Sequence, residues 1–117
     1  MTKTTNAGLQ NLIHTLKAAS AKEEAPLWKR IALDLEKPSR IRRVVNISRI
    51  NQYTQENDTV IVPGKVLSVG ELDHKVIVAA YQFSGNAMEK INKVGAAITI
   101  KELMKKHPKG EKVKLIG

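Results

Sequence analysis

The chain has 117 residues and a net charge of +9, and it contains no cysteine. The length suits one domain, over residues 1–117, with a hydrophobic core of its own, and the missing cysteine excludes disulfides, thiolate nucleophiles and cysteine–zinc sites. No apolar run approaches the roughly 20 residues of a membrane span, and the excess of lysine and arginine predicts an anionic partner for a soluble intracellular protein.

Residues 1–36 are predicted to form a helical hairpin. Apolar residues at helical spacing predict a first helix from about Asn6 to Ser20 and a second from Pro26 to about Leu35. Proline suits the first position of a helix, because an N–H at that position would have no partner within the helix. Trp28 belongs to the apolar stripe of the second helix, so we expect it in the core rather than in a binding site.

Residues 37–53 form a segment with five basic side chains and no acidic one. Valine and isoleucine are interspersed with these charges, so the segment is predicted to be anchored to the folded domain while its arginines face an anion. A buried strand is expected over Val44–Ile47, and Ser48 is expected to cap a helical turn that ends at Tyr53. Arginine suits a phosphate partner, because its planar guanidinium can donate two parallel hydrogen bonds to two oxygens.

Residues 54–117 are predicted to form an α/β core. Thr59–Val62 and Lys75–Ala80 are rich in β-branched residues and are expected to be buried strands. Pro63 and Gly64 predict a tight turn after the first of these strands, with Lys65 at its tip.

The last part of the chain continues this alternation. Ser84 is expected to begin a helix that Gly95 ends, and residues 96–98 are expected to form a short strand. Thr99 and Glu102 have the spacing of a capping box, which predicts a helix over residues 101–106. A final strand is expected over residues 113–116, within a lysine-rich end of six basic and two acidic side chains over residues 101–117. Strands that alternate with helices indicate an α/β fold with a largely buried sheet.

No catalytic residue, metal site or cofactor is predicted. The three histidines have no partner at ligand spacing, and the adjacent residues Asp73 and His74 do not build a triad or a metal site. The stretch from Pro63 to Lys65 lacks the glycine-rich start of a phosphate-binding loop and the hydroxyl residue after its lysine. We therefore expect no enzyme. The rival interpretation is a small enzyme for an anionic substrate, whose activity would be lost in His74→Ala.

Aromatic content distinguishes between kinds of nucleic-acid binding. Proteins that bind single strands stack bases on aromatic side chains, and this chain has only Trp28, Tyr53, Tyr81 and Phe83. No helix-turn-helix is recognisable. The sequence thus favours binding to the phosphate and sugar of a folded, mainly double-helical RNA, and the alternative is a DNA- or chromatin-binding basic module.

Several stretches together resemble the ribosomal large-subunit protein eighteen-e family of archaea and eukaryotes. They are Leu27–Ala32, Val45–Ile50, Thr59–Leu67, Gly70–Lys75, Val78–Ala80, Phe83–Ser84 and Pro108–Gly110. They occur in order over most of the chain, and the compact length resembles the archaeal form. The resemblance implies a structural constituent of the large ribosomal subunit in the cytoplasm, a core like that of bacterial large-subunit protein fifteen, and no catalytic residues.

The resemblance also implies contact with large-subunit ribosomal RNA, with neighbouring ribosomal proteins as further partners and no membrane or small-molecule substrate. The RNA contacts that it implies are Lys37, Arg40, Arg42, Arg43, Arg49 and Lys65. The predicted set is completed by His74, Lys75 and the lysines of residues 105–114, which include Lys105, Lys106, Lys109 and Lys112.

Overall fold

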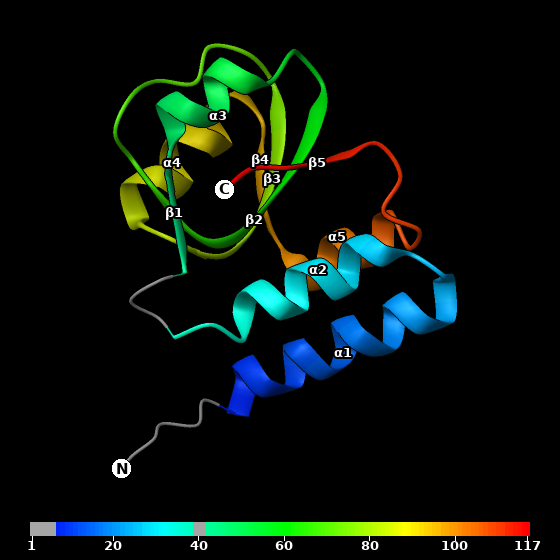
Figure 1. Cartoon of the computed structure of the whole chain (residues 1–117). Helices are drawn as coiled ribbons and strands as arrows, with labels where there is room; N and C mark the ends of the chain where they lie inside the picture. Colours follow the sequence, from blue (N-terminus) through cyan, green and yellow to red (C-terminus); the bar gives the residue numbers. More distant parts are fainter. Residues whose placement is uncertain (1–6, 39–41) are drawn as a thin grey trace.

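The computed structural model describes residues 7–38 and 42–117, which form a parallel β-sheet with helices on both faces (Figure 1). The helices are α1 (Ala7–Glu23), α2 (Pro26–Leu35), α3 (Ile47–Tyr53), α4 (Gly85–Val94) and α5 (Ile100–Lys106). The strands are β1 (Arg43–Asn46), β2 (Asp58–Leu67), β3 (Val76–Phe83), β4 (Ala96–Thr99) and β5 (Val113–Leu115). This architecture confirms the predicted α/β fold with an N-terminal helical hairpin.

Strands β1 and β5 occupy the same edge of β2, one after the other. β5 pairs with residues 59–61 of β2, and β1 pairs with residues 64–67 in the same parallel direction. The other edge of β2 pairs with β3, and β3 pairs with β4. The end of β5 therefore meets the start of β1, and Gly117 lies against the side chain of Arg43.

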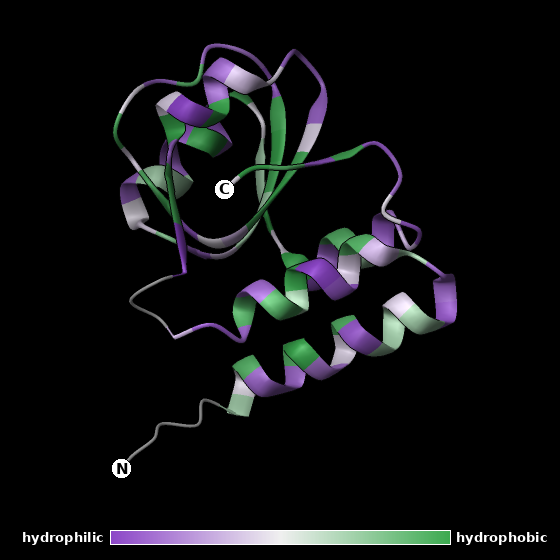
Figure 2. Ribbon diagram, in the orientation of Figure 1, coloured by the Kyte–Doolittle hydropathy of each residue, from purple (hydrophilic) through white to green (hydrophobic). Residues whose placement is uncertain are grey.

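The sheet separates two hydrophobic cores, to which alternate strand residues contribute. Val60 and Val62 of β2 belong to the core beneath α3 and α4, whereas Ile61 between them belongs to the core beneath α1, α2 and α5. A strand that is buried on both faces requires apolar residues at successive positions. In Figure 2, β2 and β3 are accordingly mostly hydrophobic, while α1 and α2 alternate hydrophobic and hydrophilic residues.

Trp28 joins the helical hairpin to the C-terminal segment. Its side chain is fully buried, and its indole N–H donates to the carbonyl oxygen of Pro108 over 2.7 Å. The neighbouring Leu27 packs on Gly110, whose φ of +67° is a conformation that favours glycine. The prediction of a core role for Trp28 is confirmed.

The predicted turn at residues 63–64 is wrong. β2 runs unbroken through them, and its register with β3 shifts between Val62 and Lys65 in a β-bulge. A methyl group on Gly64 would lie 1.9 Å from the carbonyl oxygen of Arg43, so β1 approaches β2 too closely for a side chain at this position. Lys65 consequently extends from a strand and not from the tip of a turn.

The start of α3 also differs from the prediction. The helix begins at Ile47 after Asn46, and no side chain caps it. The amide of Ser48, the predicted cap, donates instead to the carbonyl oxygen of Val69 over 3.0 Å. The loop that follows β2 thus supplies the acceptor that a capping side chain would have supplied.

Helices α4 and α5 begin as predicted. The hydroxyl of Ser84 accepts an amide hydrogen bond at the start of α4, and Thr99 and Glu102 form the capping box of α5. The backbone amide of Thr99 is the main cause that lowers the pKa of Glu102. Met88 and Val94 of α4 are exposed, and the buried residues of this helix are Ala87 and Ile91.

Candidate nucleic-acid interface

Two adjoining hollows follow the end of β5, and together we name them the furrow. The smaller hollow has a volume of about 100 Å³ and the larger about 360 Å³, and both are lined by Leu115 and Gly117. The smaller hollow is also lined by Arg30, Asp34 and Arg43, and the larger by Arg49, Tyr53, Lys114 and Ile116. The furrow thus gathers basic side chains from α2, β1, α3 and β5.

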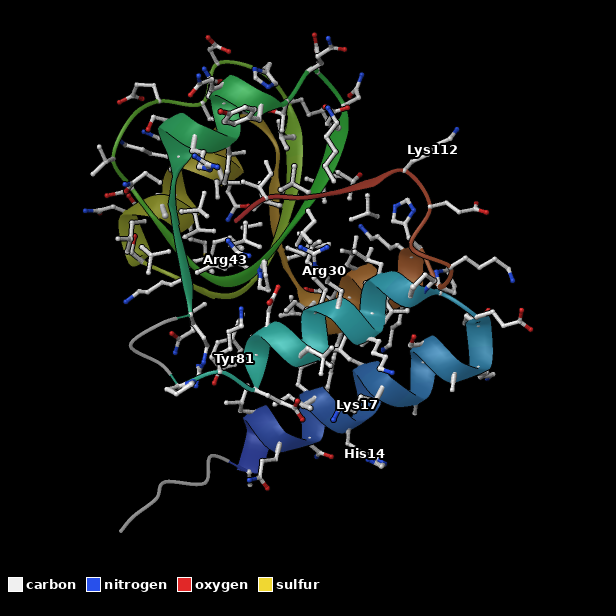
Figure 3. The ribbon with its side chains drawn as sticks, viewed as in Figure 1. His14, Lys17, Arg30, Arg43, Tyr81 and Lys112 are labelled. Atoms are coloured by element: carbon white, nitrogen blue, oxygen red, sulfur yellow. The ribbon has the colours of Figure 1, made fainter. Side chains whose placement is uncertain are left out.

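The smaller hollow places two arginines beside a buried carboxyl group. Arg30 and Arg43 reach from α2 and β1 toward the same space (Figure 3), and neither side chain has a hydrogen bond or ion pair with another described residue. One carboxylate oxygen of Asp34 lies 3.2 Å from Nζ of Lys37. Its other oxygen is buried and has no hydrogen-bond partner among the described residues. Three cations around one carboxylate leave a positive hollow that favours an anion.

Two further arginines interact with tyrosine rings. The guanidinium carbon of Arg49 lies 5.1 Å from the ring centroid of Tyr53, and that of Arg42 lies 5.5 Å from the ring centroid of Tyr81. Arg42 also donates from Nε to the carbonyl oxygen of Lys37 over 3.0 Å. A ring face orients a guanidinium without neutralising its charge, so both arginines keep the charge and donors that phosphate requires.

Carboxylates pair with lysines in this protein rather than with arginines. Lys114 lies 2.9 Å from Asp58, and Lys109 lies 3.7 Å from Glu23. In the part of the chain that the structure describes, no arginine side chain lies within 4.0 Å of a carboxylate. Exposed ion pairs contribute little to stability, but they offset the charge of these lysines while that of the arginines stays available.

The loop between β2 and β3 holds α3 in place. Asn51 accepts the amide hydrogen bond of Asp73 over 3.0 Å, and the hydroxyl of Thr54 lies 2.7 Å from Nε2 of His74. The same hydroxyl donates to the carbonyl oxygen of Ile50 over 2.7 Å. Nδ1 of His74 lies 2.8 Å from the carboxylate of Asp73, and this bond is the main cause that lowers the pKa of Asp73. Both ring nitrogens of His74 are thus engaged within the protein.

Asp58 positions Lys114 at the larger hollow. Its carboxylate accepts the backbone amide of Gln55 over 2.8 Å and lies 2.9 Å from Nζ of Lys114. The hydrogen bond from Gln55, followed by that from Lys114, lowers the pKa of Asp58. The ionised carboxylate offsets the charge of Lys114. Arg49 is therefore the cation of the larger hollow that has no carboxylate partner among the described residues.

Apart from Arg43 and Arg49, the described residues named in the predicted set do not line the furrow. Arg40 falls outside the described residues, and Lys112 projects away from Arg30 and Arg43 in Figure 3. The exposed lysines of the predicted set are Lys37, Lys65, Lys75, Lys105, Lys106, Lys109 and Lys112. The structure thus brings Arg43 and Arg49 together and spreads the lysines over other surfaces.

Other kinds of site find no support in the described residues. His14 is exposed on α1 and points away from the sheet (Figure 3). Within residues 7–38 and 42–117, no group of three or more histidine, aspartate or glutamate residues could hold a metal ion. No described helix combines the length and the hydropathy that crossing a bilayer requires.

Comparison with known proteins identifies the family. Residues 9–99 match the family described as ribosomal proteins 50S-L15, 50S-L18e and 60S-L27A. The chain belongs to this family of ribosomal proteins. It is 47% identical to large ribosomal subunit protein eL18 of Methanoregula boonei over 99% of both chains. It is 50% identical to the protein of that name from Sulfurisphaera tokodaii, over 83% of this chain and 79% of the relative, and 44% identical to that from Haloarcula marismortui, over 96% and 97%.

Membership confirms the family that the sequence motifs indicated, including its archaeal type. It also confirms the prediction that this chain is not an enzyme, because its relatives are ribosomal proteins. The archaeal relatives from Methanoregula boonei and Haloarcula marismortui match it almost from end to end.

The furrow residues of this ribosomal protein that sequence reasoning missed include Arg30, Asp34 and Tyr53. Arg30 and Asp34 are four residues apart on a helix, so their shared face was a signal available in the sequence. Tyr53 meets Lys114 only because β5 pairs with β2 beside α3. No local sequence pattern predicts the pairing of β5 with β2.

Proposed function

We propose that this ribosomal protein is a structural constituent of the large ribosomal subunit, in the cytoplasm, and that it binds folded large-subunit ribosomal RNA through phosphate contacts. The first statement follows from the family and from relatives named large ribosomal subunit proteins. The second is carried by one observation: Arg30, Arg43 and Arg49 reach one furrow from three separate elements and have no carboxylate within 4.0 Å among the described residues. Like charges gathered in this way repel one another until an anion binds between them.

The proposed contacts divide into a held set and a peripheral set. Arg42, Arg43 and Arg49 are held by a tyrosine ring or by the pairing of β1 with β2. His74 positions α3 in this interface, because both of its ring nitrogens are already bonded. The peripheral set comprises Lys37, Arg40, Lys65, Lys75, Lys105, Lys106, Lys109 and Lys112. Arg40 enters it on the sequence alone.

The proposed action is the neutralisation of phosphates where RNA helices pack against one another. Each cation that contacts a phosphate releases condensed counterions, so the affinity falls as salt rises. Five such contacts give a log–log slope of roughly −3.5 to −4.5, which corresponds to a loss on the order of a hundredfold in affinity between 50 and 200 mM salt. Neighbouring ribosomal proteins are further partners in this proposal, and α1, on the outside of the helical hairpin, is a surface that they could use.

The test is a salt titration of the affinity for a fragment of large-subunit RNA, with duplex DNA of equal length as competitor. We expect the steep slope above and preferential binding to the RNA. A nearly flat salt dependence would overturn the phosphate mechanism. Preference for the duplex DNA would instead move the assignment to the DNA-binding alternative.

A further inference from the structure

The larger hollow of the furrow holds an exposed aromatic ring beside a cationic group. Tyr53, the last residue of α3, is 53% exposed and lines the hollow together with Leu115 and Ile116. Arg49, one helical turn earlier, covers one part of the ring, with its guanidinium carbon 5.1 Å from the ring centroid. The hollow therefore presents two flat groups, an aromatic ring and a guanidinium, next to apolar side chains.

These flat groups match an unpaired nucleotide better than a base-paired one. Bases within a helix stack on one another, whereas an unpaired base can lay its face on a tyrosine ring or a guanidinium. The volume of about 360 Å³ lies within the roughly 300–1,000 Å³ of small-ligand sites. The smaller hollow, with Arg30 and Arg43, adjoins it and favours the next phosphate of the same strand.

We propose that the larger hollow binds one unpaired nucleotide of RNA, with its base against Tyr53 and its phosphate against Arg49. This inference rests on the proposed RNA binding and adds one stacked base to it, although the low aromatic content had argued against stacking. Lys114, whose charge Asp58 offsets, forms a wall of the hollow. Tyr53 is then a specificity-determining residue, because only an RNA with an extruded base at the matching position can use its ring.

The test uses the full chain and two short RNA hairpins that differ only in one bulged 2-aminopurine nucleotide. We expect the bulged hairpin to bind about 5- to 150-fold more tightly, the range for one base stacked on an aromatic side chain, and its fluorescence to be quenched on binding. Tyr53→Ala should abolish the preference and the quenching, so that the variant binds the bulged and the paired hairpin with equal affinity. Tyr53→Phe should keep the preference for the bulged hairpin and the quenching. Met88→Ala, which removes an exposed apolar side chain of α4 outside the furrow, should keep them too.

The outcomes separate this inference from the proposed function. Equal affinity of the wild-type chain for the two hairpins, with its salt dependence intact, would overturn the nucleotide site and leave RNA binding in place, and the exposed ring would then belong to a protein neighbour. A flat salt dependence for both hairpins would overturn the proposed function and the nucleotide site with it. Tyr53→Leu keeps an apolar side chain without an aromatic face, so its loss of the preference, with an unchanged thermal midpoint, excludes unfolding as the cause.

Discussion

The hairpin side of the sheet and the furrow differ in whether their polar side chains have partners within the protein. On the hairpin side, the indole of Trp28 is bonded to Pro108 and the side chains around it are buried. In the furrow, the side chains of Arg30 and Arg43 have no hydrogen bond or ion pair with another described residue, and Tyr53 is half exposed. The first region uses its groups within the fold, while the second keeps them available to a partner.

This difference predicts that stability and the proposed RNA binding depend on separate residues of this protein. Asp34 marks the boundary, because it belongs to α2 of the hairpin and yet lines the furrow with a buried, unbonded carboxylate oxygen. Such an oxygen is costly unless a donor reaches it when a partner binds. Substitutions on the hairpin side should therefore change the free energy of unfolding, and substitutions in the furrow should change the affinity for RNA.

Trp28→Ala has the largest expected effect and tests the hairpin side. Removal of a fully buried indole should lower the free energy of unfolding by about 3–5 kcal/mol, measured by chemical denaturation. Trp28→Phe is the matched control: it keeps one aromatic ring, loses the bond to Pro108 and part of the buried volume, and should destabilise less. The affinity of the folded fraction for RNA should not change, and a parallel loss of affinity would contradict the separation of the two regions.

Gly64→Ala should affect both regions at once. Its methyl group would lie 1.9 Å from the carbonyl oxygen of Arg43, a backbone atom that can yield only if β1 moves. We expect a loss of about 3 kcal/mol in the free energy of unfolding, the upper end for overpacking, and weaker RNA binding because β1 carries Arg43. Gly85→Ala is the control, since nothing lies within 4 Å of a methyl group there, and both quantities should stay near wild type. Wild-type RNA affinity in Gly64→Ala would show that the position of β1 does not matter for binding.

Arg42→Ala combined with Arg43→Ala tests the proposed RNA contacts of Arg43 in the furrow and of Arg42 beside Tyr81. The loss of two phosphate contacts should make the log–log salt slope shallower by about 1.4–1.8 and weaken RNA binding at 100 mM salt by about 25- to 60-fold. The thermal midpoint should hardly change, because neither arginine pairs with a carboxylate among the described residues. Lys93→Ala, which removes an exposed charge of α4 outside the proposed interface, is the control. If the arginine pair unfolded the protein instead, its role would be structural.

The parts of the fold that local chemistry determines could be predicted from the sequence. Pro26 and the apolar stripe around Trp28 determine α2, and the spacing of Thr99 and Glu102 determines the start of α5. The prediction of a turn at residues 63–64 failed because it considered only the local preference of proline followed by glycine. Pairing with strands on both sides keeps β2 extended at these residues. Long-range pairing outweighed the local preference at that position.

The furrow was beyond the reach of local patterns for the same reason. Arg43 and Gly117 lie far apart in the sequence and meet only because β1 and β5 share one edge of β2. The sequence could show that arginines gather in residues 37–53, but not that Arg30 and Tyr53 complete their surroundings. The pairing of carboxylates with lysines likewise depends on which side chains are neighbours in three dimensions.

A fall in pH should destabilise α3 and β5, on the furrow side, before it destabilises the hairpin helices. This is the smallest effect that we expect. The pKa of Asp58 is lowered mainly by the amide of Gln55, and that of Asp73 mainly by His74. A carboxyl group whose pKa is lower in the folded protein stabilises it above the ordinary value of about 4, and this contribution is lost as the pH falls through the lowered value. These aspartates hold β5 and α3, so amide protection against hydrogen exchange at pH 3 should fall in α3 and β5 more than in α2.

Asp73→Asn separates this cause from general acid unfolding. An asparagine side chain does not titrate in this pH range, so the hydrogen-exchange protection of α3 in the variant should no longer depend on pH through this bond. The protection at neutral pH should already be lower than in the wild type, because the variant lacks the negative charge that faces His74. Helix α5 is not a suitable reference, since the pKa of Glu102 is lowered too. Equal loss of protection in α2 and α3 as the pH falls would show that the two regions unfold as one unit, and the contrast between them would then concern binding alone.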